Sequence, residues 1–144
     1  MSLSTTYDSE NIFAKIISGD MPSVRVFEDD DILSFMDIFP ASEGHTLVIS
    51  KTAKATNLLD IEVDQLQTLI AGTQRVAKAI ETSLGPDGIR LVQFNGEPAG
   101  QTVFHLHFHI IPVYGEAPLN MHGTGDPLGA DVLEPIAAKI RAAF

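Results

Sequence analysis

The sequence predicts an α+β fold, in which an antiparallel sheet of about five strands is flanked by helices. Short apolar runs bounded by polar or glycine-bearing turns occur in pairs that can form hairpins. The period changes to that of an amphipathic helix between residues 60 and 84, and within residues 103–112 three histidines alternate with apolar residues at a period of two. Hairpin-linked strands separated from helices are typical of α+β proteins. At 144 residues with 44% hydrophobic residues, we expect one domain over residues 1–144 with a substantial core.

The N-terminal part should contain a short helix. Residues 1–9 are polar and are expected to be disordered, and they lack the apolar segment of a signal peptide, which favours a cytoplasmic protein. Asp8 or Ser9 can cap a helix over residues 12–17 that ends at Gly19.

The remaining elements follow from alternation and helical spacing. We expect strands at residues 24–28, 32–37 and 45–50, the first two joined in a hairpin by the polar turn 29–31. A long helix from about Asp60 should end at Gly85, with its apolar stripe in the core. A strand at 88–95 and the alternating stretch 103–112 should form a second hairpin through the loop 96–102. Asp131 can cap a last helix within the C-terminal segment 115–144. The stripe of the long helix is Leu66, Leu69, Ile70, Val76, Ala77, Ile80 and Leu84.

Charge and composition argue against a nucleic-acid ligand, a membrane-spanning helix and cysteine-based sites. The net charge is −10, and the nine basic residues form no cluster, so a nucleic-acid backbone is a disfavoured ligand. No apolar run reaches the ~20 residues of a membrane-spanning helix. The absence of cysteine excludes disulfides and thiolate metal ligands.

Three histidines in one alternating stretch are the strongest chemical signal. His105, His107 and His109 alternate with Leu106, Phe108 and Ile110, so a strand would place three imidazoles on one face and an apolar row on the other. Adjacent histidines could share a zinc ion, but the three together span too far, and a closed site would need two more ligands. Phosphoryl chemistry fits better, because one neutral imidazole can attack phosphorus while a neighbour protonates the leaving group.

These residues resemble the HxHxHxx motif, with apolar x, of the histidine triad (HIT) family of nucleotide hydrolases and transferases. Residues 12–17, 35–40, 44–49 and 95–104 are similar to other blocks of that family, and the resemblance covers residues 10–114. It implies a HIT-like fold, a two-fold homodimer, no cofactor, and a C-terminal tail that varies between members.

The resemblance also implies roles for individual residues. His107 would attack the α-phosphorus and become nucleotidylated, and water would then release the nucleotide. His109 and Thr102 would lie near the leaving group, His105 would support the phosphate pocket, and His45 would lie behind the triad as a hydrogen-bonding partner. Asp37 would hold the ribose hydroxyls. The purine would be enclosed by Ile12, Phe13, Ile16, Phe35 and Ile38, for which a core role is the alternative, and the phosphate side lined by Asn95, Gly100 and Gln101.

Two departures from the family bear on metal and substrate. Relatives that bind zinc carry Cys-x-x-Cys where this chain has Asn11 and Ala14, so no metal is expected. Residues 111–115 lack the Gly-Gly ending of the phosphoramidase branch. We predict a hydrolase or transferase of purine (AMP- or GMP-type) nucleoside phosphoramidates or related adenylated molecules. The alternatives are a dinucleoside polyphosphate hydrolase and a non-catalytic nucleotide-binding or metal-binding dimer module.

Overall fold

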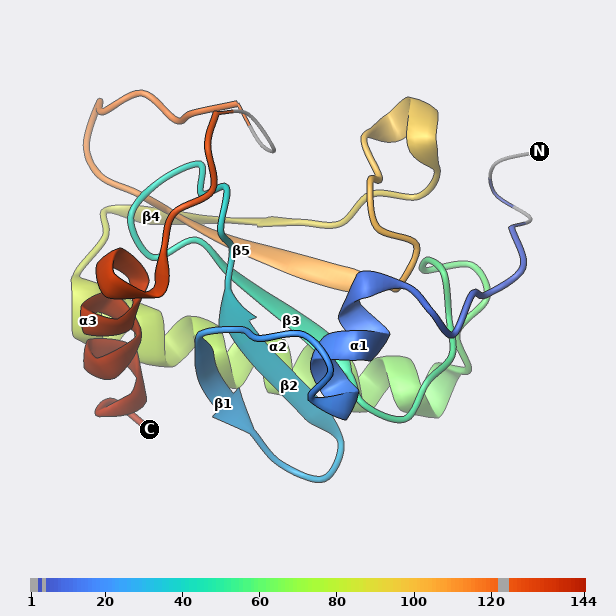
Figure 1. Ribbon diagram of the computed structural model, residues 1–144. Helices are drawn as coiled ribbons and strands as arrows, with labels where there is room; N and C mark the ends of the chain where they lie inside the picture. The colour runs from blue at the N-terminus through green and yellow to red at the C-terminus, as the bar shows by residue number, and fades with distance from the viewer. Residues whose placement is uncertain (1–2, 4, 122–124) are drawn as a thin grey trace.

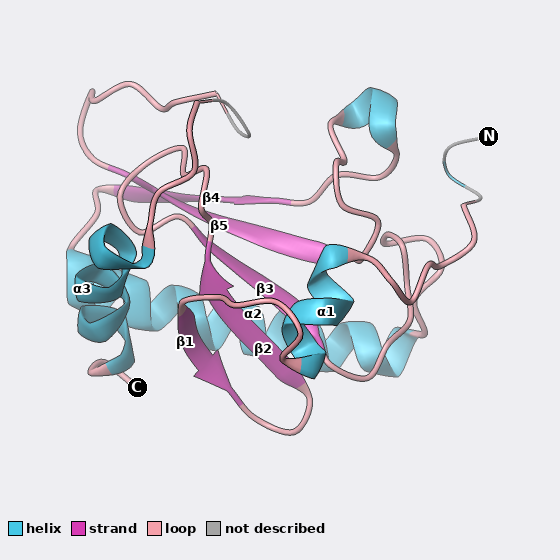
Figure 2. Cartoon of the chain, viewed as in Figure 1, coloured by secondary structure: helices cyan, strands magenta, loops and turns pink. Residues whose placement is uncertain are grey.

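A computed structural model describes residue 3 and residues 5–121 and 125–144, and it has the predicted architecture (Figure 1). The described strands form one antiparallel sheet in the order β1-β2-β3-β5-β4, which confirms the α+β fold class (Figure 2). None of the described helices is long and apolar enough to span a membrane. The strands are β1 (Arg25–Glu28), β2 (Ile32–Met36), β3 (Thr46–Ser50), β4 (Gly88–Val92) and β5 (His107–Val113), and the helices are α1 (Ile12–Ser18), α2 (Val63–Leu84), the short 3₁₀ helix η2 (Glu97–Ala99) and α3 (Ala130–Arg141).

The sheet separates two apolar clusters. On one face the sheet packs against α2 and α3, and Leu106, Phe108 and Ile110 belong to this cluster, as their alternation predicts. Helix α1 lies on the other face (Figure 1), and its Phe13 and Ile16 belong to a smaller cluster there. The smaller cluster shares its face of β5 with His107 and His109, because odd-numbered and even-numbered residues of a strand point to opposite sides.

The beginning of α1 differs from the prediction. Asn11, and not Asp8 or Ser9, caps the helix, since its Oδ1 accepts the backbone N–H groups of Phe13 at 3.0 Å and Ala14 at 2.9 Å. Asp8 Oδ1 instead accepts the N–H of Glu10. The helix ends at Gly19 as predicted.

Helix α2 begins later than predicted, and helix α3 begins earlier. Asp60 does not start α2, because its carboxylate accepts the N–H groups of Thr56 and Asn57 in the preceding turn. Within the predicted stripe, Ile70 is 40% exposed and lies outside the core. Gly129, and not Asp131, occupies the N-cap position of α3.

The histidine strand is shorter than predicted. β5 begins at His107, so residues 103–106 are not part of the ladder. The last pair between β3 and β5 joins Ile49 to His107. Beyond it the chain turns away, since Ser50 Oγ accepts the N–H of Ala53. His105 therefore precedes the strand, and the N–H of Leu106 after it donates to the carbonyl of Ala55 at 2.9 Å instead of to a strand of the sheet.

Candidate active site

A cavity of about 610 Å³ opens on the α1 side of the sheet. This volume lies within the range of pockets for small ligands. Most of the wall is apolar, and the polar groups that line it are Asp37, Thr102, His107, His109 and Ser23. A largely apolar pocket with a few polar groups suits a ligand with both a ring and polar substituents.

Most of the predicted site residues line this cavity. Phe13, Ile16 and Phe35 are buried in its wall, whereas Ile12 and Ile38 are 44% and 43% exposed at its edge. The nine predicted residues that line it are Ile12, Phe13, Ile16, Phe35, Asp37, Ile38, Thr102, His107 and His109. His45 and His105 are fully buried behind them.

The three predicted phosphate-side residues are not among the lining residues of the cavity. Gln101 Oε1 accepts the N–H of Gly96 at 2.8 Å, and its Nε2 donates to the carbonyl of Thr56 at 2.6 Å. Asn95 Oδ1 accepts the N–H of Leu58 at 2.9 Å. Gly100 has φ +114° and lies close to the Phe94 ring. These contacts brace the loop that carries Thr102.

His107 is held in one tautomer by its own chain. Its Nδ1 lies 2.7 Å from the carbonyl oxygen of His105. Because a carbonyl only accepts, Nδ1 carries the proton, and Nε2 of the neutral ring keeps its lone pair. The ring meets the edge of Phe13 at a centroid distance of 4.9 Å and an angle of 87°. The arrangement selects the tautomer in which the Nε2 lone pair of the neutral ring can act as a nucleophile.

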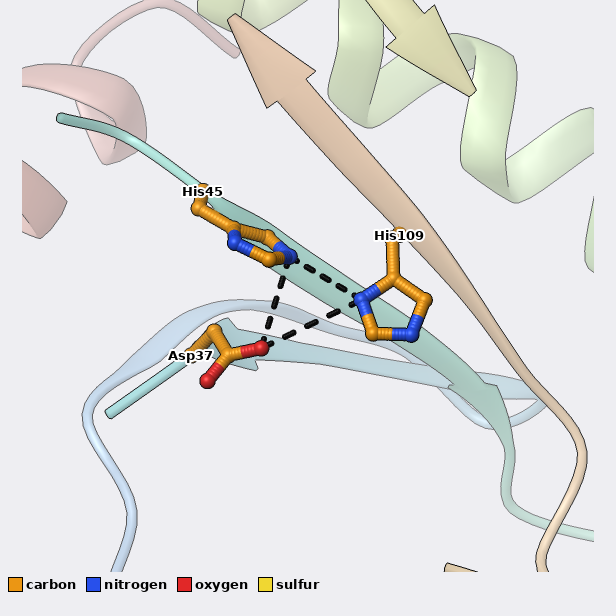
Figure 3. A group of neighbouring side chains, drawn as sticks. All are labelled: Asp37, His45 and His109. Carbon is orange, nitrogen blue, oxygen red and sulfur yellow. Dashed lines mark hydrogen bonds and ion pairs between the residues drawn. The ribbon is translucent and has the colours of Figure 1, made fainter. Parts of the chain in front are cut away.

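His45, His109 and Asp37 form a second polar cluster (Figure 3), in which His109 and Asp37 line the cavity and His45 lies behind them. The N–H of Ala41 donates to His45 Nδ1 at 2.9 Å, so the neutral ring carries its proton on Nε2. That Nε2 lies 3.0 Å from His109 Nδ1, which therefore accepts and leaves the His109 proton on Nε2. Asp37 Oδ2 lies 3.4 Å from His45 Nε2 and 3.9 Å from His109 Nδ1. A buried carboxylate at this range stabilises a positive charge on either ring.

The same three residues are close enough to share a metal ion, since one ligand atom of each lies within 4.8 Å of the others. Their hydrogen bonds do not suit one. A neutral histidine that binds a metal through Nε2 needs its proton on Nδ1, yet His45 Nδ1 accepts the N–H of Ala41. The tautomer of His45 therefore disfavours this cluster as a metal site.

His105 is bound at both ring nitrogens. Its Nε2 lies 3.2 Å from the carbonyl oxygen of Ser50, and its Nδ1 lies 2.8 Å from the hydroxyl of Tyr7. Burial lowers the pKa of His105 to about 4, so the ring is neutral at neutral pH. Tyr7 lies within residues 1–9, where disorder is expected. Residues 5–9 follow a described path, whereas residues 1, 2 and 4 lie outside the described residues.

Besides Met36, Phe39, Leu47 and Val103, two segments that are absent from the predicted site line the cavity. One is the segment from Met21 to Val24 between α1 and β1, and the other is the C-terminal segment with Leu128 and Leu133. The N–H of Leu128 donates to the carbonyl of Ile38 at 2.9 Å, which brings this segment to the cavity. No local sequence pattern marks either part, because each reaches the site only through the path of the chain.

Comparisons with known proteins agree with this fold. A HIT domain family model matches residues 18–116. A Hit-like protein involved in cell-cycle regulation from Bartonella henselae, crystallised with an unknown ligand, superposes with a TM-score of 0.88 at 47% identity and covers 96% of this chain and 99% of its own. Protein hit of Bacillus subtilis is 42% identical over 119 residues, which are 83% of this chain and 76% of the relative. Adenylylsulfatase HINT3 of Arabidopsis thaliana is 36% identical over 109 residues, 76% of this chain and 55% of that protein.

Proposed function

Since this chain belongs to the HIT domain family, we propose that it is a hydrolase or transferase that cleaves purine nucleotide conjugates at the α-phosphorus. The reaction would proceed through a nucleotidyl group on His107. The observation that carries the proposal is the hydrogen bond from His107 Nδ1 to the His105 carbonyl, which keeps the Nε2 lone pair on a ring that lines the cavity. The name of the Arabidopsis relative, an adenylylsulfatase, supports a reaction at an adenylyl group.

The proposed chemistry has two steps. In the first, His107 Nε2 forms a bond to the α-phosphorus while the bond from phosphorus to the leaving nitrogen or oxygen breaks. The leaving atom takes a proton from His109, whose pairing with His45 beside Asp37 can hold one extra proton. In the second, water attacks the phosphorus, its proton passes to His109, and the bond to His107 breaks. The nucleotide leaves with both rings restored.

The apolar part of the cavity wall suits a purine nucleoside. Phe13 and Phe35 offer buried apolar surface for the base. Ser23 Oγ is buried without a hydrogen-bond partner among the described residues, so a polar edge of the base would satisfy it. Asp37 Oδ1 already accepts the N–H of Phe39, but each carboxylate oxygen has a second acceptor site that a ribose hydroxyl can use.

The outer edge of the sheet supports the expected homodimer. β4 is the edge strand next to β5, and Ile89 and Leu91 on it are 37% and 50% exposed. Exposed apolar residues on an unpaired edge strand favour pairing with another chain, and a two-fold axis would join identical edges.

A turnover screen with rapid quench tests the proposed function. We expect hydrolysis of adenosine phosphoramidates and an AMP adduct on His107, seen by mass spectrometry as a base-stable, acid-labile modification. His107→Asn should bind AMP nearly as well as the wild type, because the base and ribose contacts remain, while turnover falls by several orders of magnitude. Faster cleavage of diadenosine polyphosphates would favour the polyphosphate hydrolase. Absence of any adduct and of turnover, with stoichiometric bound metal, would favour the non-catalytic metal-binding module.

A further inference from the structure

We propose that Tyr7 is a positioning residue for the nucleophile, which acts by donating its hydroxyl proton to His105 Nδ1 and so holding the backbone carbonyl that orients His107. The proposal rests on the proposed function of the same site, and it extends that function to the N-terminal segment before α1.

The ring of His105 is anchored by its own contacts because the residue lies outside the ladder, which begins at His107. The peptide that joins His105 to Leu106 has one backbone hydrogen bond, from the N–H of Leu106 to the carbonyl of Ala55 at 2.9 Å. The ring itself is held by the carbonyl of Ser50 at one nitrogen and the hydroxyl of Tyr7 at the other. The carbonyl of the same residue accepts the Nδ1 proton of His107 at 2.7 Å. A shift of His105 therefore moves the group that sets the tautomer and direction of the nucleophilic ring.

The position of the proton on His105 determines which partner donates in each of its two ring hydrogen bonds. The Ser50 carbonyl can only accept, so His105 carries its proton on Nε2 and offers a lone pair on Nδ1. Tyr7 must then be the donor. His105 is 2% exposed, so water has little access to replace a lost donor. Without the hydroxyl, the tautomer that carries its proton on Nδ1 and a rotated orientation of the His105 ring come closer in free energy to the native arrangement. The hydrogen bond from His105 to the Ser50 carbonyl is then weaker.

The hydroxyl can be removed without removing the packing. Tyr7 is half-buried, and its ring contacts the His105 ring at a centroid distance of 5.6 Å and an angle of 59°. Tyr7→Phe keeps this ring contact and deletes the donor alone. Tyr114, the other of the two tyrosines in the chain, is a matched control, because its hydroxyl donates to the Glu43 carbonyl at the same length of 2.8 Å.

The kinetic test compares Tyr7→Phe with Tyr114→Phe on an adenosine phosphoramidate. We expect kcat of Tyr7→Phe to fall about two- to twelvefold, the range that the net contribution of one hydrogen bond gives, with KM unchanged because the purine and ribose contacts remain. Tyr114→Phe should keep the wild-type kcat. In a His105→Gln background, Tyr7→Phe should cause no further loss, since its effect passes through His105. Equal losses in both backgrounds would overturn the proposal.

A spectroscopic test detects the hydrogen bond between Tyr7 and His105 directly. In ¹⁵N NMR spectra of the histidine side chains, wild-type His105 should show a protonated Nε2 and a hydrogen-bonded, unprotonated Nδ1. Tyr7→Phe should shift the Nδ1 resonance towards that of an unbonded nitrogen and disturb His107 Nδ1, and Tyr114→Phe should change neither. Unchanged His105 and His107 spectra in Tyr7→Phe would refute the proposal. Absence of wild-type turnover would instead overturn the proposed function, and the NMR response would still decide whether Tyr7 orders His105.

Discussion

Gly44→Ala adds a methyl group beside the active site where the backbone and the packing both oppose it. Gly44 has φ +91° in the turn before β3. A Cβ at this position would lie 2.4 Å from Leu84 Cδ1 at the end of α2 and 3.3 Å from Pro112 Cγ in β5. Something must move to admit the methyl group, because carbon atoms do not approach to 2.4 Å.

The expected loss of stability has two parts. A left-handed backbone costs an L-residue roughly 1–2 kcal/mol. Overpacking costs about 1–3 kcal/mol in addition, and it should be at the lower end because Leu84 is half-buried and can partly yield. The free energy of unfolding should therefore fall by about 2–4 kcal/mol, a large part of the ~5–15 kcal/mol typical of a folded domain.

Urea unfolding of Gly44→Ala beside Gly85→Ala separates the two parts. Gly85 also has positive φ, +60°, but a Cβ there would meet no atom within 4 Å. Gly85→Ala should lose only the backbone part, about 1–2 kcal/mol. The turn of Gly44 also holds His45, whose N–H donates to the Ser42 carbonyl at 3.2 Å, so kcat should fall only in Gly44→Ala. Equal stability losses in the two variants, with kcat unchanged in both, would refute this reasoning.

Three further predictions concern the base, the dimer and pH. Ser23→Ala should weaken AMP binding by about 0.5–1.5 kcal/mol in calorimetry without lowering stability, and ribose 5-phosphate binding should not change; an equal loss for both ligands would rule out a base contact. Leu91→Glu should convert the dimer to monomers in sedimentation experiments, because it puts a charge on the exposed edge strand β4. A dimer that persists in this variant would show that the interface lies elsewhere. The lowered pKa of His105, about 4 against an ordinary 6.5, means that the unfolded chain binds more protons between these values. The free energy of unfolding should therefore fall by up to about 3 kcal/mol as pH drops from about 6.5 to about 4, and His105→Gln should flatten this part of the curve.

Local periodicity in the sequence was sufficient to predict the α+β architecture. Alternation assigned Leu106, Phe108 and Ile110 to the core, and they lie in the cluster against α2. Helical spacing and terminal glycines predicted where α1 and α2 end, at Gly19 and Gly85. These features are local because a strand or helix fixes which way each side chain points, and glycine alone enters the left-handed cap at little cost.

The beginnings of elements were less predictable because several polar residues compete for the same role. Asp8, Ser9 and Asn11 can all cap a helix, and the contacts of the folded chain selected Asn11. Ile70 fits the apolar stripe of α2 by spacing, but its side chain is 40% exposed, because spacing along a helix does not report which other elements cover each position.

The sequence by itself determined that His107 and His109 share a face, that Leu106 and Phe108 face the core, and that the chain carries the histidine triad motif. Only the tertiary structure decided that His105 lies outside the strand, because its place depends on where β3 ends. The contact between Tyr7 and His105 joins residues 98 positions apart, and no periodicity reports such a contact. Alternation encodes the direction of a side chain relative to its own backbone, whereas the neighbours it meets depend on the paths of distant segments.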